Sequence, residues 1–574
     1  MKKIILSVLT IFVASFHQNS AAQDAQTAPY GVTSSADPRA TEAGMEILEK
    51  GGSASDAAMA MMLALTVVEP QSSGIGGGGF LIYADGATNG LTTINGRETA
   101  PAAATPDRFL DENGKPLGFL KAMPGGRSVG VPGNIQLMAM AHRKWGRLPW
   151  ADIFAPAIRL ADEGYEVNET MAKRLEQIAR LWGDFPEAQK LFWVDGKPAP
   201  AGTIIKNPAL AETLRILASQ GPDAFYTGEI AEQIVEAVQK APVNAGDMTL
   251  SDLAAYKAKE QNALCTPYRV YVVCGMGPPS SGATTVLQIL GTLTPYDMTK
   301  LGKDNPHSWY LLGQAMQLAY ADREKYLGDP DFVDVPTLGL IDPDYLKFRS
   351  KLINPKKALT NFEAGTPPGA SPRTAAVSSE VSGTTHFVAV DPQGSVATMT
   401  STIEGIFGSQ LIAGGFMLNN ELTDFTFAPE ENGAPVANRV EAGKRPLSSM
   451  SPTLVFDQNG RKVLALGSAG GKRIIMHVTK TLIGVLDFGL PLEEAIALPN
   501  IYFGRGKLML EEETPLAKMA EDLAKYGQEV DVTDLGSKVN GAQLTVEGWR
   551  GAADPRGEGT AQSKIIIAPP QTVQ

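Results

Sequence analysis

Apolar residues recur with helical spacing through much of the first two thirds of the chain. Residues 41–50 (TEAGMEILEK) carry an apolar face and are followed by Gly51-Gly52, which predicts a helix that ends there. Residues 55–68 (SDAAMAMMLALTVV) are apolar almost all round, with Ser55 as the expected N-cap. Because this run is too short to cross a bilayer, we expect a buried core helix.

The middle of the chain predicts several more helices and then an irregular segment. The helical segments are 135–145, 153–163, 169–181, 230–240 and 308–326. Residues 358–383 consist mainly of Ala, Gly, Pro, Ser and Thr, with no helical period and little to bury. This composition predicts an exposed, mobile loop.

The pattern changes from helical to strand-like directly after this loop. Residues 385–390 (THFVAV) and 395–401 (SVATMTS) are rich in β-branched residues and flank a turn, which predicts a hairpin. A second pair of short strands is expected at 453–456 and 462–466, followed by a helix at 473–486. The point where the loop 358–383 meets a strand that begins with threonine is therefore the most informative feature of the sequence.

Composition places the chain among globular proteins and argues against some classes of binding partner. It has 574 residues, of which 43% are hydrophobic and 20% charged, so disorder, collagen and coiled coil are poor interpretations. The net charge is −12 and no run of Lys and Arg is present, which argues against a nucleic-acid partner. The five histidines are scattered, which argues against a histidine-rich metal site.

The first residues read as an export signal. Lys2-Lys3 precede an apolar stretch, 4–16, and Ser20-Ala21-Ala22 offers the small residues that a signal peptidase needs. We expect residues 1–22 to be removed, a periplasmic or secreted location, and no membrane span in the mature chain. A retained anchor is the alternative, although the apolar stretch is short for a membrane span.

Export to an oxidising compartment would allow the two cysteines to form a disulfide. Cys265 and Cys274 flank eight residues (TPYRVYVV) that can form a tight hairpin with the cysteines facing each other. In an oxidising compartment this pattern predicts a structural disulfide. Two buried free thiols remain the alternative, and neither interpretation supplies a nucleophilic cysteine.

A glycine run at 74–79 (GIGGGG) matches the dinucleotide-binding pattern G-x-G-x-x-G in letters only. It follows a predicted helix and precedes a strand-like segment, 80–84, whereas the nucleotide motif follows a strand and opens a helix. We therefore expect a closely packed backbone turn rather than a nucleotide site.

Elimination of other nucleophiles leaves a threonine that acts with its own α-amine. The sequence has no G-x-S-x-G and no H-E-x-x-H, and its cysteines are expected to be bonded. A threonine at a new N-terminus needs a cleavable loop before it and a strand after it, which Gly383-Thr384 satisfies. Its freed amine, with a pKa of about 8, can accept the hydroxyl proton near neutral pH. The alternative is an ordinary strand that begins with two β-branched residues.

The ordered motifs of the chain resemble those of the γ-glutamyltransferases, members of the N-terminal nucleophile hydrolase superfamily. The resemblance covers almost all of the mature chain and is carried by TEAGMEILEKGGSASDAA, VVEPQSSGIGGGGF, NGRETAPAAATPDRF, SVGVPG, PAIRLADEGYEV, PPSSG, LAYADREKYLGDPDF, TTHFVAVD, LNNELTDF, KRPLSSMSPT and GSAGGKRII. It implies an α+β fold, the four-layer αββα sandwich of that superfamily, and no metal or organic cofactor.

The resemblance also implies a precursor that cuts itself between Gly383 and Thr384. The products would be a large subunit, 23–383, and a small subunit, 384–574, which form one intertwined domain as a heterodimer. Thr384 would be the nucleophile, and Thr402 matches the second threonine that hydrogen-bonds it.

The remaining motif residues correspond to binding positions for a γ-glutamyl group. Arg97, Ser448 and Ser449 match partners of the donor α-carboxylate, while Glu421 and Asp424 match acceptors for its α-ammonium. Gly470 and Gly471 match the pair whose backbone N–H groups form the oxyanion hole.

One position departs from the family pattern. Where the family usually has Asn as a further ligand of the α-ammonium, this chain has Glu404, which leaves donor choice open. The segment 425–447 varies in the family as a lid, and here its composition suggests an exposed loop.

The expected activity is transfer of the γ-glutamyl group of glutathione or related amides to water, an amino acid or a peptide. A glutaryl-type cephalosporin acylase is the alternative within the same family. The three carboxylates near the amino site argue against it, because a glutaryl group lacks the ammonium that would neutralise them. A non-enzymatic alternative is an uncleaved relative that only binds.

Overall fold

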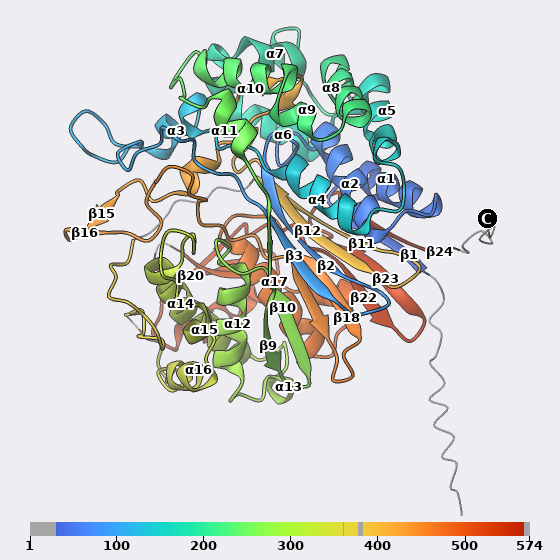
Figure 1. The fold of residues 1–574 in the computed structure, drawn as a ribbon. Helices are drawn as coiled ribbons and strands as arrows, with labels where there is room; N and C mark the ends of the chain where they lie inside the picture. Colours follow the sequence, from blue (N-terminus) through green and yellow to red (C-terminus); the bar gives the residue numbers. More distant parts are fainter. Residues whose placement is uncertain (1–29, 360, 377–382, 505, 567–574) are drawn as a thin grey trace, which may run out of the picture.

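The computed structural model describes residues 30–359, 361–376, 383–504 and 506–566 and contains two antiparallel sheets packed face to face (Figure 1). The strands of the seven-stranded sheet are, in spatial order, β24 (Thr560–Ile565), β1 (Tyr30–Ser35), β11 (Thr384–Val390), β12 (Val396–Thr402), β2 (Gly78–Ala84), β3 (Leu91–Gly96) and β8 (Lys259–Gln261). Those of the six-stranded sheet are β23 (Gly548–Ala553), β22 (Asn540–Thr545), β18 (Lys462–Gly467), β17 (Thr453–Phe456), β10 (Tyr271–Gly275) and β9 (Leu264–Tyr268). The predicted signal, residues 1–22, lies outside the described residues.

Apolar side chains fill the space between the two sheets. Val388, Val390 and Val396 from the first sheet meet Leu454 and Ala465 from the second, and all are fully buried. This layer is narrow and made mostly of Val and Ala, so the sheets can approach closely. It forms the middle of the sandwich.

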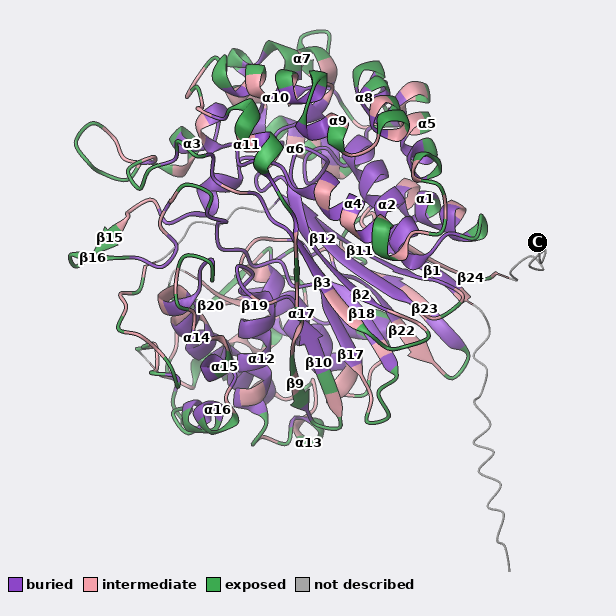
Figure 2. Cartoon of the chain, viewed as in Figure 1, coloured by how far each residue is buried: buried purple, intermediate pink, exposed green. Residues whose placement is uncertain are grey.

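Helices cover the outer face of each sheet and complete four layers (Figures 1 and 2). The helices packed over the seven-stranded sheet include α1 (Pro38–Glu49), α2 (Ala54–Val68), α4 (Asn134–Trp145) and α5 (Ala155–Glu163). Those over the six-stranded sheet include α12 (Gly282–Leu293), α14 (Pro306–Tyr326), α17 (Arg473–Leu486) and α18 (Leu492–Ala497), and α16 (Pro343–Ser350) packs against α12. The predicted αββα sandwich is therefore the observed fold.

The strongly patterned elements lie where the sequence predicts them. Every residue of α2 is buried, as the all-round apolar run indicates, and the predicted hairpin is β11 with β12. The N-cap of α2 is Ser53 rather than the expected Ser55, because Ser53 forms a capping box with Asp56. Further helices occur at α6 (Glu169–Ile178), α8 (Pro208–Gln220) and α10 (Glu229–Gln239).

The irregular segment before β11 is anchored rather than simply exposed and mobile. Its described parts contain no helix or strand, as predicted, but Pro367 is buried and the Gly365 N–H donates to Asp322 at 2.7 Å. The Ala376 N–H donates to the Glu324 carbonyl at 3.1 Å. Residues 377–382 lie outside the described residues.

Both sheets combine strands from before and after Thr384. In the seven-stranded sheet β11 pairs with β1 on one side and with β12 on the other, and β12 pairs with β2. A cut before Thr384 would therefore leave two fragments joined by strand pairing and a shared core.

The two cysteines form the disulfide that their spacing predicts. Cys265 on β9 and Cys274 on β10 are directly opposite residues of a hairpin and are bonded through their sulfur atoms. Among the helices of the described residues, none combines the length and apolar character needed to cross a bilayer.

Candidate active site

Thr384 and Thr402 face each other at the end of the β11–β12 hairpin. They are paired in the strand register, and their side-chain oxygens lie 3.2 Å apart. The glycine run lies against this end of the hairpin, since a Cβ at Gly77 would lie 1.9 Å from the Thr402 carbonyl oxygen. The run is thus the closely packed turn that its context predicts, and it supports the backbone of Thr402.

The hydroxyl of Thr402 links Thr384 to the peptide bond before it. Thr402 Oγ1 donates to the Gly383 carbonyl oxygen at 2.8 Å and accepts the Glu404 N–H at 2.8 Å. A hydroxyl has one proton to donate, so Thr402 accepts from Thr384 while it donates to Gly383. This arrangement polarises the Gly383–Thr384 carbonyl and positions the Thr384 oxygen beside it.

A small cavity of about 20 Å³ brings together most residues expected at the site. Its lining consists of Arg97, Thr384, Thr402, Glu404, Glu421, Asp424, Ser448, Ser449, Met450, Gly471 and Ile474. Gly470 does not line this cavity but is the neighbour of Gly471 in the same turn. The volume holds little more than a water molecule, because the charged side chains are bonded to one another.

Arg97 is fully buried and forms ion pairs with two of these carboxylates. Its Nη1 pairs with Glu421 and its Nη2 with Asp424. Nη2 also donates to the Leu447 carbonyl at 2.8 Å, and Nε donates to the Pro446 carbonyl at 3.2 Å. Burial opposes the charge of Arg97, but the two carboxylates raise its pKa, so the guanidinium stays charged. Arg97 is therefore bonded to the same carboxylates that are expected to accept an ammonium.

Four buried carboxyl groups surround this single arginine. Glu98, Glu404 and Glu421 are at most 3% exposed and Asp424 is 6% exposed. Burial raises the pKa of Glu98 to about 7 and raises that of Glu421 well above its usual range, although the charge of Arg97 partly offsets both shifts. Neither Glu98 oxygen, nor Glu421 Oε2, has a hydrogen-bond partner among the described residues. The site thus has an excess of acceptors that favours binding of a small cationic group.

Ser448 and Ser449 are held at the cavity by a buried arginine and by the PPSSG motif. Arg323 Nη2 donates to Ser449 Oγ at 2.8 Å, and Arg323 Nε donates to Ser281 Oγ at 2.9 Å. Ser281 Oγ in turn donates to the Ser448 carbonyl at 2.7 Å. From the sequence, no role was assigned to Arg323 or Ser281. Both lie in motifs shared with the family, and this position is what could have pointed to them.

The Gly470-Gly471 turn presents its amides at the start of α17. The two residues have φ values of +132° and +60°, which glycine adopts without the strain that a side chain would cause. Neither N–H donates to another described residue, so both are available to an oxyanion. Below the turn, His477 Nδ1 lies 3.0 Å from Ser468 Oγ, and burial lowers the pKa of His477 well below its usual value.

The segment 425–447 is packed at both ends and exposed at its tip and at Ala442-Gly443. Phe425 and Leu447 are buried, whereas the small hairpin of β15 (Glu430–Glu431) and β16 (Ala434–Pro435) extends away from the sandwich (Figure 1). The expectation of an exposed loop is thus correct for this tip and for Ala442-Gly443, but not for the rest of the segment. No residue of 425–447 lines the small cavity.

Comparison with known proteins identifies what the chain resembles. The sequence pattern of the family described as Gamma-glutamyltranspeptidase matches residues 40–563. The glutathione hydrolase proenzyme of Bacillus subtilis (strain 168) is 39% identical over 82% of this chain and 80% of its own length. That of Escherichia coli (strain K12) is 37% identical over 92% of this chain and 91% of its own. Among solved structures, the cephalosporin acylase from Bacillus halodurans superposes with a TM-score of 0.82 at 27% identity, covering 93% of this chain and 96% of that one.

Proposed function

We propose, because the chain belongs to the γ-glutamyltranspeptidase family, that it is a glutathione hydrolase and γ-glutamyltransferase that matures by cutting itself. It would take the γ-glutamyl group of glutathione or a related amide and pass it to water or to an amine. The observation that carries the proposal is the paired Thr384 and Thr402 beside a cavity with one buried arginine and an excess of carboxylates. The cavity suits a group that has both an α-carboxylate and an α-ammonium.

Processing would start from the geometry of the uncut chain. The Thr384 oxygen attacks the Gly383 carbonyl carbon, while Thr402 donates to the carbonyl oxygen on which negative charge develops. The hydroxyl proton passes to the Thr384 nitrogen as the C–N bond breaks and an ester forms. Water then hydrolyses this ester, which leaves a Gly383 carboxylate and a free α-amine on Thr384.

Catalysis would reuse the same oxygen with the new amine as base. The α-amine takes the hydroxyl proton as Thr384 attacks the γ-carbonyl of the donor. The N–H groups of Gly470 and Gly471 stabilise the oxyanion, and the protonated amine of Thr384 then gives its proton to the leaving amine. Water or an acceptor amine reverses these steps on the γ-glutamyl ester.

Donor binding would exchange ion pairs inside the cavity. The α-ammonium of the donor takes the place of Arg97 at Glu421 and Asp424, and Arg97 with Ser448 and Ser449 binds the α-carboxylate. Each carboxylate keeps a cationic partner and Arg97 keeps an anionic one, which limits the desolvation cost of opening a cavity this small. Glu404, whose Oε2 accepts from Asn420 at 3.0 Å, adds negative charge beside the ammonium.

The large and small fragments, 23–383 and 384–574, would remain a heterodimer because both sheets contain strands from each. The export signal predicted at residues 1–22 is the basis for proposing a periplasmic or secreted location. The proposed enzyme is thus both cut into two subunits and exported.

A glutaryl-specific acylase is the second candidate, favoured by the structural similarity to the cephalosporin acylase. The two functions are separated by turnover of γ-glutamyl-p-nitroanilide and glutaryl-p-nitroanilide, with Thr384→Ala as the inactive control. We expect the γ-glutamyl donor to give at least about a hundredfold higher kcat/KM, since the glutaryl group leaves the carboxylates without a cation. Equal turnover of both donors would overturn the ranking.

A further inference from the structure

The glycine turn proposed as the oxyanion hole is followed by a residue that α14 holds at two points. Lys472 comes directly after Gly471 and is the N-cap of α17. Its carbonyl oxygen accepts the Tyr320 hydroxyl at 2.5 Å, and its Nζ lies 2.7 Å from Glu324 Oε1. The first contact fixes the main chain of Lys472, and the second fixes the end of its side chain.

Tyr320 and Glu324 lie on the same face of α14. They are four residues apart in the helix, which places their side chains one above the other. The side chains of Glu324 and Lys472 are only 15% and 14% exposed. An ion pair with so little exposure is screened less by solvent than a surface pair. One face of α14 therefore gives a two-point support to the residue that follows the turn.

The direction of the two glycine amides depends on this support. Consecutive glycines allow the backbone many conformations, and neither has a side chain that could pack. The carbonyl oxygens of Gly470 and Gly471 accept the N–H groups of Arg473 and Ile474, at 3.3 and 3.0 Å, which joins the turn to the start of α17. A shift of Lys472 would therefore turn the two amides as well.

The same helix also holds a second wall of the small cavity. Arg323, the neighbour of Glu324, donates to Glu324 Oε1 at 3.0 Å and to Ser449 Oγ at 2.8 Å. A continuous network thus joins Lys472 to Ser449, which is proposed to bind the donor α-carboxylate. α14 in this way sets the position of the turn relative to the place where the donor would be bound.

We propose that Tyr320 and Glu324 are positioning residues, which hold the amides of the glycine turn in the direction needed to stabilise the oxyanion. They act through Lys472, and neither lines the small cavity. The inference rests on the proposed function and adds two residues to its machinery. Because hydrogen bonds to the oxyanion strengthen only as charge develops, loss of this support should raise the barrier to reaction and leave ground-state binding almost unchanged.

The test measures two competitive inhibitors on wild type and on the double variant Tyr320→Phe with Glu324→Gln. Norvaline has the α-amino acid group and carbon chain of glutamate without the side-chain oxygens, so it reports ground-state binding. The second inhibitor is the glutamate analogue whose side-chain carboxyl is replaced by a boronic acid. Its boron bonds to Thr384 Oγ while the hydroxyl proton passes to the Thr384 amine, and the tetrahedral anion places an oxygen where the oxyanion develops.

We expect the double variant to raise the inhibition constant of the boronic acid about tenfold and to lower kcat/KM for γ-glutamyl-p-nitroanilide by a similar factor, less than the loss of a whole oxyanion donor. The inhibition constant of norvaline should stay within about twofold of wild type. Self-cleavage should keep its wild-type rate, because Thr402 rather than the turn donates to the Gly383 carbonyl.

Two single variants test the same contact without the double change. Lys472→Arg keeps a cation opposite Glu324 and should retain most of the wild-type affinity for the boronic acid. Lys472→Met removes only the ion pair and should lose about threefold, with norvaline unaffected. This variant decides the question if the double variant fails to fold.

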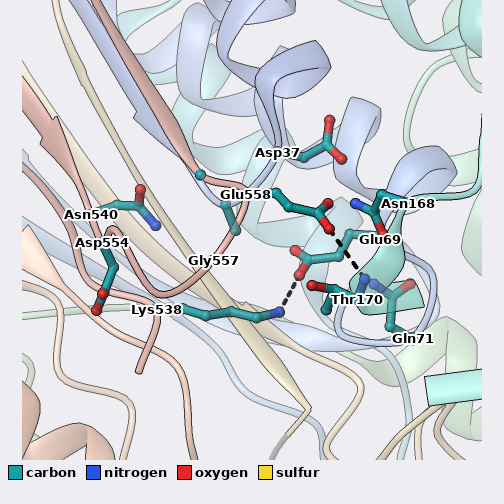
Figure 3. Close-up of a pocket in the computed structure, with 12 residues that line it drawn as sticks. Asp37, Glu69, Gln71, Asn168, Thr170, Lys538, Asn540, Asp554, Gly557 and Glu558 are labelled. Carbon is teal, nitrogen blue, oxygen red and sulfur yellow. Dashed lines mark hydrogen bonds and ion pairs between the residues drawn. The ribbon is translucent and has the colours of Figure 1, made fainter. Parts of the chain in front are cut away.

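Glu69→Gln is the matched control, because the same substitution removes the carboxylate partner of another lysine. Glu69 pairs with Lys538 in the wall of a separate cavity (Figure 3), and neither residue lines the small cavity. It should keep the wild-type ratio of the two inhibition constants. Equal changes of both constants in the double variant, or no change in either, would overturn the inference alone. A wild-type protein that turns over no γ-glutamyl donor would overturn the proposed function and the inference with it.

Discussion

Thr384 and Thr402 are directly opposed residues of an antiparallel strand pair, with their side-chain oxygens 3.2 Å apart. The register of β11 and β12 fixes this contact, and a slip of one residue would move one hydroxyl to the other face of the sheet. The nucleophile is therefore positioned by a buried hairpin rather than by a flexible loop. The same hairpin holds the Gly383 carbonyl against Thr402.

Removal of the Thr402 hydroxyl should slow self-cleavage. In Thr402→Ala the Gly383 carbonyl loses its donor, so we expect cleavage about 10²-fold slower, as for other single oxyanion donors. Thr402→Ser keeps the hydroxyl and should cleave within about tenfold of wild type. The measurement is the rate at which the two fragments appear on a denaturing gel after a pulse of synthesis; cleavage of Thr402→Ala at the wild-type rate would exclude this role.

Arg97→Lys should weaken donor binding more than it slows the chemical step. Lysine cannot bind the α-carboxylate through two parallel hydrogen bonds, so we expect KM for γ-glutamyl-p-nitroanilide to rise at least about tenfold. Arg108→Lys is the control, because Arg108 also forms a double contact, with Asp247, but does not line the small cavity. An unchanged KM in Arg97→Lys would contradict the assignment.

Glu404→Asn should reduce discrimination between γ-glutamyl and glutaryl donors. The substitution removes one of the buried negative charges beside the expected ammonium site, so KM for the γ-glutamyl donor should rise about three- to tenfold. KM for the glutaryl donor should fall, because less negative charge is left unpaired. Glu430→Asn, at the exposed tip of the segment 425–447, should change neither value. A lower KM for the γ-glutamyl donor in Glu404→Asn would show that Glu404 opposes binding.

Glu98 should make the free energy of unfolding fall as the pH rises. Burial raises the pKa of Glu98 from 4.5 to about 7, so between these values the folded protein binds more protons than the unfolded chain. The stability gained from the neutral carboxyl is present at pH 4.5 and is lost by pH 7 and above. The glutamine in Glu98→Gln cannot ionise, so the free energy of unfolding of this variant should not fall for this reason as the pH rises.

Denaturant unfolding of wild type and Glu98→Gln at pH 5 and pH 8 measures the effect. The difference in unfolding free energy between the two proteins should shift by about 3 kcal/mol in favour of the variant at the higher pH. Contributions from the other carboxyl groups largely cancel in this difference. A difference that does not depend on pH would mean that Glu98 has an ordinary pKa.

The sequence predicts those parts of the fold in which one strong local pattern decides the structure. The all-round apolar run of α2 and the β-branched hairpin of β11 and β12 are examples. In contrast, no local pattern predicts β1, yet Tyr30–Ser35 pairs with β11 and β24 inside the sheet. Its sequence, YGVTSS, has little apolar pattern, and its burial depends on partners more than 350 residues away.

The site could be assembled only from the resemblance, because its residues are distant in the sequence. Arg97 meets Glu421 across 324 positions, a contact that no local spacing encodes. Glu98 and Arg323 were not assigned, since charged residues are usually exposed and their complete burial follows only from tertiary packing.

The central claim is that Thr384 frees itself and then carries the γ-glutamyl group. Intact-mass and peptide-mapping spectrometry of protein quenched during turnover of a γ-glutamyl donor tests this directly. We predict two fragments, the smaller beginning at Thr384 and carrying one γ-glutamyl group on that residue, and a single unmodified chain for Thr384→Ala. A wild-type protein that remains one chain, or an acyl group found on another residue, would contradict the account.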